Sequence, residues 1–212
     1  MKKYILPFAG FIMLTLALVG CRKDPLRDMT EDESRIYITN RDSSANFGAL
    51  RTFSISDTVA VISNNRLEDR QSTGFDKAVV NAVKREMADR GYTLVANGAK
   101  PDIGINVSRV YNSSTGIISY PDYWGGYYGY YDPFYWGYPG YGYNFPGSYG
   151  VYEITEGALS IDMLDLKNAN QADKSIKGIW NGLIRGTGVF SSGNVDTNVR
   201  GLFVQSPYLR SN

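Results

Sequence analysis

The spacing of hydrophobic residues predicts one long helix in the first half of this chain. Between Ser72 and Arg90 apolar side chains recur every four residues, with charged residues on the other positions, which is the pattern of a helix with one buried face. Ser72 or Thr73 can cap its start, and Gly91 suits the left-handed position after its end. The apolar stripe consists of Phe75, Val79, Val83 and Met87.

Most other hydrophobic segments alternate with a period of two, which predicts strands. A hairpin is expected where the last two strands are joined by the polar loop 167–175. A short amphipathic helix is predicted over Asn194–Gln205, before Pro207. The predicted strands are 35–39, 47–55, 58–62, 92–95, 102–111, 157–166 and 176–184. Together the elements predict a single α+β domain, with a mainly antiparallel sheet and the long and the short helix packed on one face.

The N-terminus has the pattern of a secretory signal that ends in a lipobox. Lys2 and Lys3 precede an apolar run, and Gly20 precedes Cys21, the only cysteine. We interpret residues 1–20 as a signal peptide and Cys21 as the residue that carries the acyl chains, palmitate among them. The run is short for a transmembrane helix, which needs about 20 apolar residues. A plain signal peptide would need no cysteine.

The residues after Cys21 predict where the protein is anchored. Arg22 stands where the inner-membrane retention signal has Asp, so we expect lipid anchoring to the outer membrane of the cell envelope, with the periplasmic or surface face left open. Residues 21–34 are charged and lack periodicity, which is typical of a solvated tether. The α+β lipoprotein domain is then expected over residues 35–212.

A segment rich in Tyr, Gly, Pro and Trp interrupts the domain at residues 119–150. Its Gly and Pro content argues against a continuous helix or central strand. Because it contains almost no aliphatic residues, we expect a long loop that does not bury itself. Its aromatic rings are the candidate ligand-binding residues: Tyr123, Trp124, Tyr128, Tyr131, Tyr135 and Trp136.

Four interpretations of this loop remain open. It is an idle low-complexity loop, a face that stacks on glycans, an element that inserts at the membrane interface, or a surface for self-association or docking to another envelope protein. Nucleic acid is not an expected partner, because the loop from residue 120 to residue 152 has no Lys or Arg.

The composition excludes several kinds of chemistry. The chain has no histidine, so it has no Ser-His-Asp triad and no His-containing metal site. With 22 basic and 21 acidic residues it is near neutral. We therefore expect no cofactor, no metal and no enzymatic activity.

An enzyme remains the alternative, because four acids follow the aromatic loop. Glu153, Glu156, Asp162 and Asp165 suggest a carboxylate-dependent glycan-processing enzyme. However, the spacing places Glu153 and Glu156 on opposite faces of a strand, and it separates Asp162 from Asp165 in the same way. We interpret these acids as solvated residues of strand edges and turns. The loop with Asp165, Asn168, Asn170 and Asp173 lacks the central Gly and closing Glu of an EF-hand, so no calcium site is predicted.

Several short motifs resemble one known family. They are Phe53, Arg90-Gly91-Tyr92 and Lys100-Pro101-Asp102-Ile103 in the first half, and 152–165 and Ile179-Trp180-Asn181-Gly182 in the second. From about Ile36 to Tyr208 the chain resembles the domain of unknown function 4136 family, whose members often carry a Gly/aromatic-rich insertion here. The chain departs from the family at Ala158, where Thr is common, and at Asn181, where Arg is common.

The family has no agreed activity, so the resemblance implies a single envelope lipoprotein domain and no catalytic residues. We interpret the matching glycines and aspartates as caps, turns and close contacts: Gly91, Asp102, Gly157, Asp165 and Gly182. The sequence thus predicts a membrane-anchored, non-enzymatic binding or structural module that displays its aromatic loop to a glycan or to another envelope protein.

Overall fold

The computed structural model describes residues 30–63, 66–111, 117–119, 133–145, 151–153 and 157–212. A nine-stranded sheet forms its centre, with the path β1-β11-β10-β6-β2-β5 and with β3, β4 and β8 attached beside that path. The strands are β1 (Ile36–Arg41), β2 (Thr52–Ile55), β3 (Val59–Ser63), β4 (Arg66–Gln71), β5 (Thr93–Leu94), β6 (Ile103–Val110), β8 (Gly142–Asn144), β10 (Ala158–Asn170) and β11 (Ser175–Arg185). A separate antiparallel pair joins β7 (Ile117–Ser119) to β9 (Val151–Glu153).

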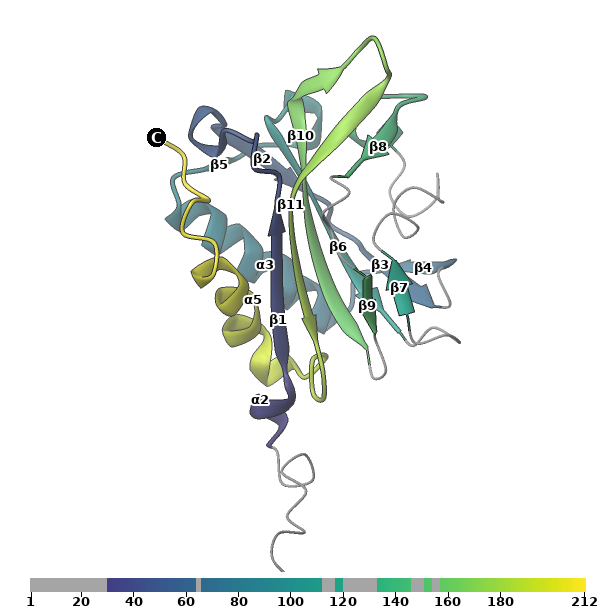
Figure 1. Ribbon diagram of the computed structural model, residues 1–212, viewed down its shortest axis with the longest axis vertical. Coiled ribbons are helices and arrows are strands. Elements are labelled where there is room, and N and C mark those ends of the chain that lie inside the picture. Colours follow the sequence, from purple (N-terminus) through teal and green to yellow (C-terminus); the bar gives the residue numbers. More distant parts are fainter. Residues whose placement is uncertain (1–29, 64–65, 112–116, 120–132, 146–150, 154–156) are drawn as a thin grey trace, which may run out of the picture.

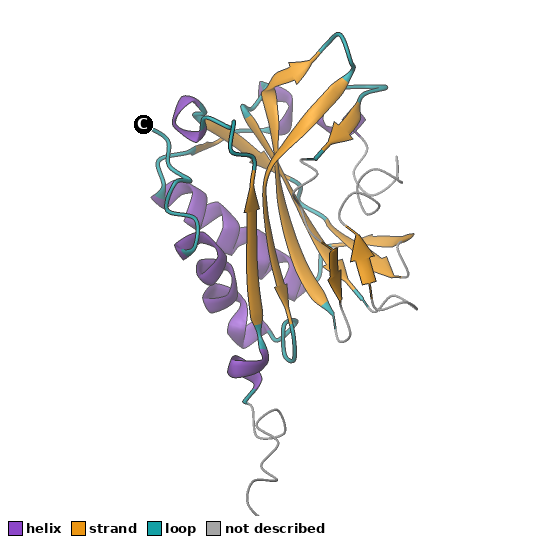
Figure 2. Ribbon diagram, in the orientation of Figure 1, coloured by secondary structure: helices purple, strands orange, loops and turns teal. Residues whose placement is uncertain are grey.

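Two helices cover one face of this sheet (Figures 1 and 2). They are α3 (Gly74–Asp89) and α5 (Val195–Val204), and a single turn, α2 (Glu31–Ser34), precedes β1. The long strands β1, β11, β10 and β6 are antiparallel, whereas β2 and β3 join β6 in parallel and β8 joins β11 in parallel. The predicted α+β class is confirmed, with a mixed sheet. Within the described residues no helix is long and apolar enough to cross a bilayer.

The long helix begins and ends as its sequence predicts. Thr73 caps α3 in a capping box: its backbone N–H donates to Asp76 Oδ2 (2.8 Å), and Asp76 N–H donates to Thr73 Oγ1 (3.2 Å). Gly91 follows with φ +85°, a conformation that costs glycine little. The apolar faces of α3 and α5 pack on the sheet around Trp180, which is fully buried and donates its indole N–H to Ser206 Oγ (2.9 Å).

A buried ion pair joins the start of α3 to the sheet. Arg109 in β6 places its Nε 3.0 Å from Asp76 Oδ1, with the two side chains 11% and 1% exposed. Arg109 also donates to the Tyr111 hydroxyl (2.8 Å) and to the side chain of Gln71. The carboxylate of Asp76 therefore serves both the helix cap and the ion pair.

In the first half of the chain one predicted strand boundary was wrong and one strand was missed. Residues Phe47–Ala49 form a single 3-10 turn, and the strand predicted over 47–55 begins only at Thr52. The charged strand β4 was not predicted. It lies beside β3 alone and is largely exposed, so it carries no hydrophobic alternation that a sequence pattern would reveal.

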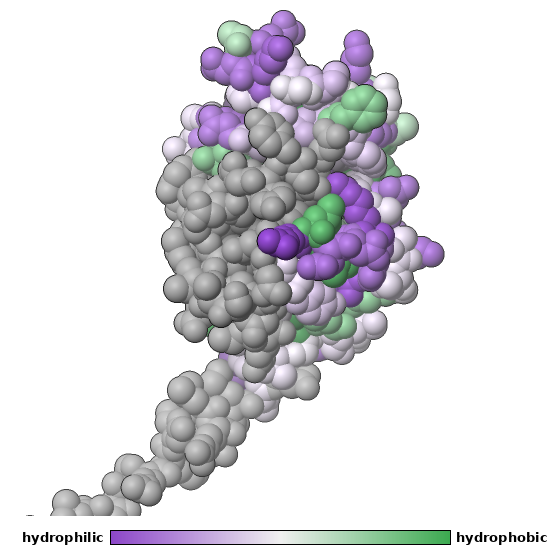
Figure 3. Space-filling view, turned by 90° about the vertical axis from the view of Figure 1, so that its right-hand side faces the viewer, coloured by the Kyte–Doolittle hydropathy of each residue, from purple (hydrophilic) through white to green (hydrophobic). Residues whose placement is uncertain are grey.

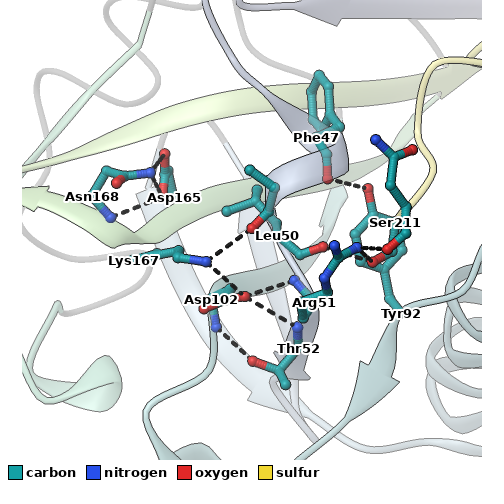
Figure 4. Close-up of polar contacts among 12 residues, drawn as sticks. Phe47, Leu50, Arg51, Thr52, Tyr92, Asp102, Asp165, Lys167, Asn168 and Ser211 are labelled. Carbon is teal, nitrogen blue, oxygen red and sulfur yellow. Dashed lines mark hydrogen bonds and ion pairs between the residues drawn. The ribbon is translucent and has the colours of Figure 1, made fainter.

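A polar cluster around Asp102 holds the ends of three strands together (Figure 4). Asp102 Oδ2 accepts from the backbone N–H of Arg51 (2.6 Å) and lies 3.6 Å from Lys167 Nζ, while the Asp102 N–H donates to Thr52 Oγ1 (3.0 Å). Beside it the Tyr92 hydroxyl donates to Phe47 O (3.2 Å), and burial raises the pKa of Tyr92 to about 12. Every partner named here is another part of the fold, which supports a structural role for Asp102.

Candidate binding surface on the outer face of the sheet

The face of the sheet that points away from the helices is buried, although its sequence predicts a solvated face. In β10 every residue from Ala158 to Leu164 is buried, on both sides of the strand. The polar residues of that face are at most 1% exposed: Asn106, Ser108, Ser160, Asp162 and Asn181. The interpretation of Asp162 as a solvated acid was therefore wrong. Figure 3 views this side, where the described surface is largely hydrophilic with scattered hydrophobic residues.

The described part of the aromatic segment, residues 133–145, packs onto this outer face. Trp136 is 5% exposed and lies among Leu164, Leu166 and Ile176. Gly104 makes room for its indole, since a Cβ there would lie 3.0 Å from the ring. The expectation that the segment does not bury itself was wrong for Pro133 and Trp136, whereas the other residues of 134–145 are exposed or half-buried. Its aliphatic partners come from the outward-pointing positions of β10 and β11, which are distant in sequence.

The structure describes two of the six predicted ligand-binding residues. Trp136 is buried, so its ring belongs to the packing of the sheet. Tyr135 is half-buried, and its pKa is raised by burial and by the nearby charge of Asp57. The other four, Tyr123, Trp124, Tyr128 and Tyr131, lie outside the described residues, as does Cys21.

A hollow of about 510 Å³ opens beside these two aromatic residues. One wall is the turn Asn97–Pro101, which precedes β6, and the other is the segment Phe134–Tyr138. Phe134 is 68% exposed, which makes it the most exposed large hydrophobic side chain of the described residues. The volume lies in the range typical of small-molecule sites. Phe134 was not among the predicted residues, because the candidates were chosen from the tyrosines and tryptophans of the segment.

The lining of this hollow combines aromatic surface with polar atoms that have no partner. Asn97 Nδ2 donates a hydrogen bond to the Tyr135 carbonyl oxygen. Asn97 Oδ1 and Trp136 Nε1 are buried and have no hydrogen-bond partner among the described residues. The Tyr138 hydroxyl donates to Leu166 O (2.6 Å), and burial raises its pKa. Both unpartnered atoms are buried, so the surface that the hollow offers to a ligand consists chiefly of its aromatic rings, whose flat faces suit ligands with flat apolar faces.

Deeper in the sheet a row of polar side chains crosses four strands. Asp162 Oδ1 accepts from Asn181 Nδ2 (2.7 Å), and Asn40 Nδ2 lies 3.5 Å from Asn181 Oδ1. Asn106 faces Asp162 from β6, and neither atom of its side-chain amide has a hydrogen-bond partner within the described part of the chain. Unpartnered buried polar groups are rare in folded proteins and cost stability. This row was not predicted, because alternating polar residues on a strand are also the pattern of a solvated face.

The acids proposed for catalysis do not come together in the described residues. Asp165 accepts hydrogen bonds from the backbone N–H and the side-chain amide of Asn168, and Asp173 accepts one from the side-chain amide of Asn170. The side chains of Glu153 and Glu156 lie outside the described residues. In the described ranges no group of three or more His, Cys, Asp or Glu side chains could hold a metal ion.

Fold and surface define a class: a single α+β domain whose sheet carries helices on one face and a Gly/aromatic segment on the other. The family model described as a domain of unknown function (DUF4136) matches residues 38–208, and the chain belongs to this family. No curated protein matches the chain.

The solved structures that match this chain include the following two. The crystal structure of a DUF4136 family protein from Bacteroides thetaiotaomicron is 26% identical, with a TM-score of 0.72 over 85% of this chain and 100% of that one. A PelC dodecamer structure from Paraburkholderia phytofirmans is 6% identical, with a TM-score of 0.40 over 84% of this chain and 99% of that one.

Proposed function

We propose that this protein is a non-enzymatic glycan-binding module of the cell envelope, and that the hollow beside Phe134 is its binding site. The observation that carries the proposal is the lining of the hollow. Exposed and half-buried rings from Phe134, Tyr135 and Tyr138 line the hollow, together with the polar turn Asn97–Pro101. Sugar rings offer apolar faces for stacking and hydroxyl groups that both donate and accept hydrogen bonds.

The shape of the site favours a glycan over the other interpretations of the aromatic segment. Insertion at a membrane interface calls for several projecting apolar side chains, whereas Phe134 is the one exposed ring of residues 133–145: Trp136 is buried, and Tyr135 and Tyr138 are half-buried. An idle loop would not have the tight packing of Trp136 against Gly104 and Leu166. The packed segment instead supplies a rigid wall, which limits the entropy lost on binding.

The enzyme alternative is less well supported by the same surface. Hydrolysis of a glycosidic bond commonly uses two carboxyl groups that face one cleft. Asp162 is fully buried, and the described lining of the hollow beside Phe134 contains no carboxylate. The proposal therefore assigns binding, and no reaction, to this hollow.

The experiment that tests the proposal replaces Phe134. The full-length chain and Phe134→Ala are titrated with soluble oligosaccharides representing neutral, amino-sugar and uronic-acid polysaccharides, with affinity measured by calorimetry. We expect at least one oligosaccharide to bind the wild-type chain and Phe134→Ala to bind it about fivefold to tenfold more weakly, the effect of losing one aromatic contact.

Val204→Ala is the matched control, because Val204 is 64% exposed and does not line the hollow. Equal affinity of the wild-type chain and Phe134→Ala would contradict the proposal, as would the absence of binding to every oligosaccharide. A deletion of residues 119–150 is a poorer test. It would remove Trp136 and β8 and expose Leu164, Leu166 and Ile176, so lost binding could reflect lost folding.

We further propose that Cys21 anchors the domain to the outer membrane through acyl chains. The proposal is supported by residues 1–21, where a basic start and an apolar run end in Gly20-Cys21. We expect Cys21→Ser to abolish incorporation of radiolabelled palmitate and to release the protein from the membrane fraction, because several acyl chains provide the binding energy. Unchanged fractionation of Cys21→Ser would contradict the anchor.

A further inference from the structure

A second hollow adjoins the one beside Phe134. Its volume is about 460 Å³, and its lining includes Ser54, Asp57, Lys84 and Leu94. The two hollows share Asn97 and Tyr135, and these residues are tied together by the hydrogen bond from Asn97 Nδ2 to the Tyr135 carbonyl. The shared residues make the two hollows neighbouring compartments of one groove, which passes from the aromatic segment over β2 and β5 toward α3.

Each compartment contains one lysine. Lys100 lines the hollow beside Phe134, and Lys84, on α3, lines the second. Neither lysine forms an ion pair or a hydrogen bond with another described residue. Two other lysines of the domain have acidic partners: Lys167 pairs with Asp102 and Lys177 with Asp42. The groove therefore presents two ammonium groups that are available to a ligand.

The remaining charge in the groove offsets only one of these two ammonium groups, because Asp57 lines the second compartment beside Lys84. Among the described residues that line the two compartments, Asp57 is the only acid, and Lys84 and Lys100 are the two bases. The backbone at Lys100 is also unusual, since its φ of +53° is the left-handed conformation that favours Gly or Asn. Lys100 is exposed and belongs to the lining of the hollow beside Phe134.

We propose that the groove binds an acidic oligosaccharide, a glycan whose sugar units carry carboxylates, across both compartments. In this arrangement one sugar unit stacks on the rings beside Phe134 with its carboxylate near Lys100. A following unit crosses Tyr135 and Asn97, and its carboxylate lies near Lys84. This inference rests on the proposed glycan site and adds the charge and the length of the ligand.

The test compares two ligands that differ only in charge. The probes are tetragalacturonic acid and its fully methyl-esterified form, titrated into the full-length chain by calorimetry. We expect the acid to bind more tightly than the ester, and its affinity to fall as salt is raised from 20 mM to 500 mM, roughly the range over which screening of exposed charges becomes strong. The affinity of the ester should change little with salt.

Lysine variants assign the effect to the two compartments. Lys100→Gln and Lys84→Gln should each lower the affinity for the acid by about threefold to fivefold, the upper range for an exposed ion pair. The affinity for the ester should stay unchanged. Lys174→Gln is the matched control. Lys174 also has a positive φ (+48°), is exposed and lies at the tip of the β10-β11 hairpin, away from the groove.

The outcomes separate this inference from the proposed function. Equal affinities for the acid and the ester, with both weakened in Phe134→Ala, would overturn the acidic ligand and leave the glycan site standing. A preference for the acid that is undiminished in both lysine variants would also overturn the inference. Binding of another oligosaccharide but of neither probe would also overturn the acidic-ligand inference. If no glycan bound at all, the proposed function itself would be wrong.

Discussion

Trp136→Ala should lower the free energy of unfolding by about 3–5 kcal/mol, the usual cost of truncating a buried tryptophan. The indole is 5% exposed and fills the space between Gly104, Leu166 and the neighbouring aliphatic residues of the outer face. Its removal leaves a cavity that these strands cannot close without moving. The measurement is urea-induced unfolding of the full-length chain, followed by tryptophan fluorescence and circular dichroism.

Phe134→Ala is the control for this prediction, because the side chain of Phe134 lies in the same segment as Trp136 but is 68% exposed. We expect its stability to stay within about 0.5 kcal/mol of the wild-type value, as for most surface substitutions. The pair then separates the two roles of the segment: Trp136 holds it on the sheet, and Phe134 is available to a ligand. If Trp136→Ala unfolded at the same urea concentration as the wild-type chain, residues 133–145 would not be part of the folded core.

The helices and the β10-β11 hairpin could be predicted from the sequence because their signals are local. The four-residue spacing from Phe75 to Met87, the cap at Thr73 and the stop at Gly91 lie within one short stretch, and α3 follows them closely. The hairpin was likewise predicted from two segments of alternating hydrophobicity and the polar loop between them. In each of these cases the sequence signal and the tertiary contacts favour the same structure.

The burial of the outer face could not be predicted, because its cause lies in contacts between distant residues. Ser160 and Asp162 alternate with Leu159 and Ile161, a pattern that a half-solvated strand would share. At Leu164 and Leu166 the covering residues come from the segment 133–145, which packs on this end of β10. The same contact explains why an aromatic segment without aliphatic neighbours in sequence is folded: its neighbours are Leu164 and Leu166.

The candidate site was predicted in part for the same reason. Aromatic composition pointed to Tyr135 and Trp136, and both lie at the hollow. Asn97, Lys100 and Lys84 complete the groove from a turn and a helix earlier in the chain. Nothing in the local sequence of these three residues marks them as ligand-binding, since each is an ordinary polar residue of a turn or a helix surface.

Arg109→Met should also destabilise the fold by about 3–5 kcal/mol, because it leaves the buried carboxylate of Asp76 without its cation. The carboxylate is 1% exposed, and the guanidinium lies 3.0 Å away. Methionine keeps much of the side-chain volume, so the loss reflects charge and hydrogen bonds more than a cavity. Thermal and urea unfolding at neutral pH measure the change.

A second substitution tests this cause. Asp76→Asn removes the buried charge and keeps an oxygen that can accept from the Thr73 N–H. The double variant Asp76→Asn/Arg109→Met should therefore be more stable than Arg109→Met alone, a favourable coupling between two residues in contact. Simple addition of the two destabilisations would show that the pair is not coupled. The exposed pair Arg85–Asp196, with side chains 58% and 79% exposed, is the matched control: Arg85→Met should cost no more than about 1 kcal/mol, because water solvates the carboxylate that remains.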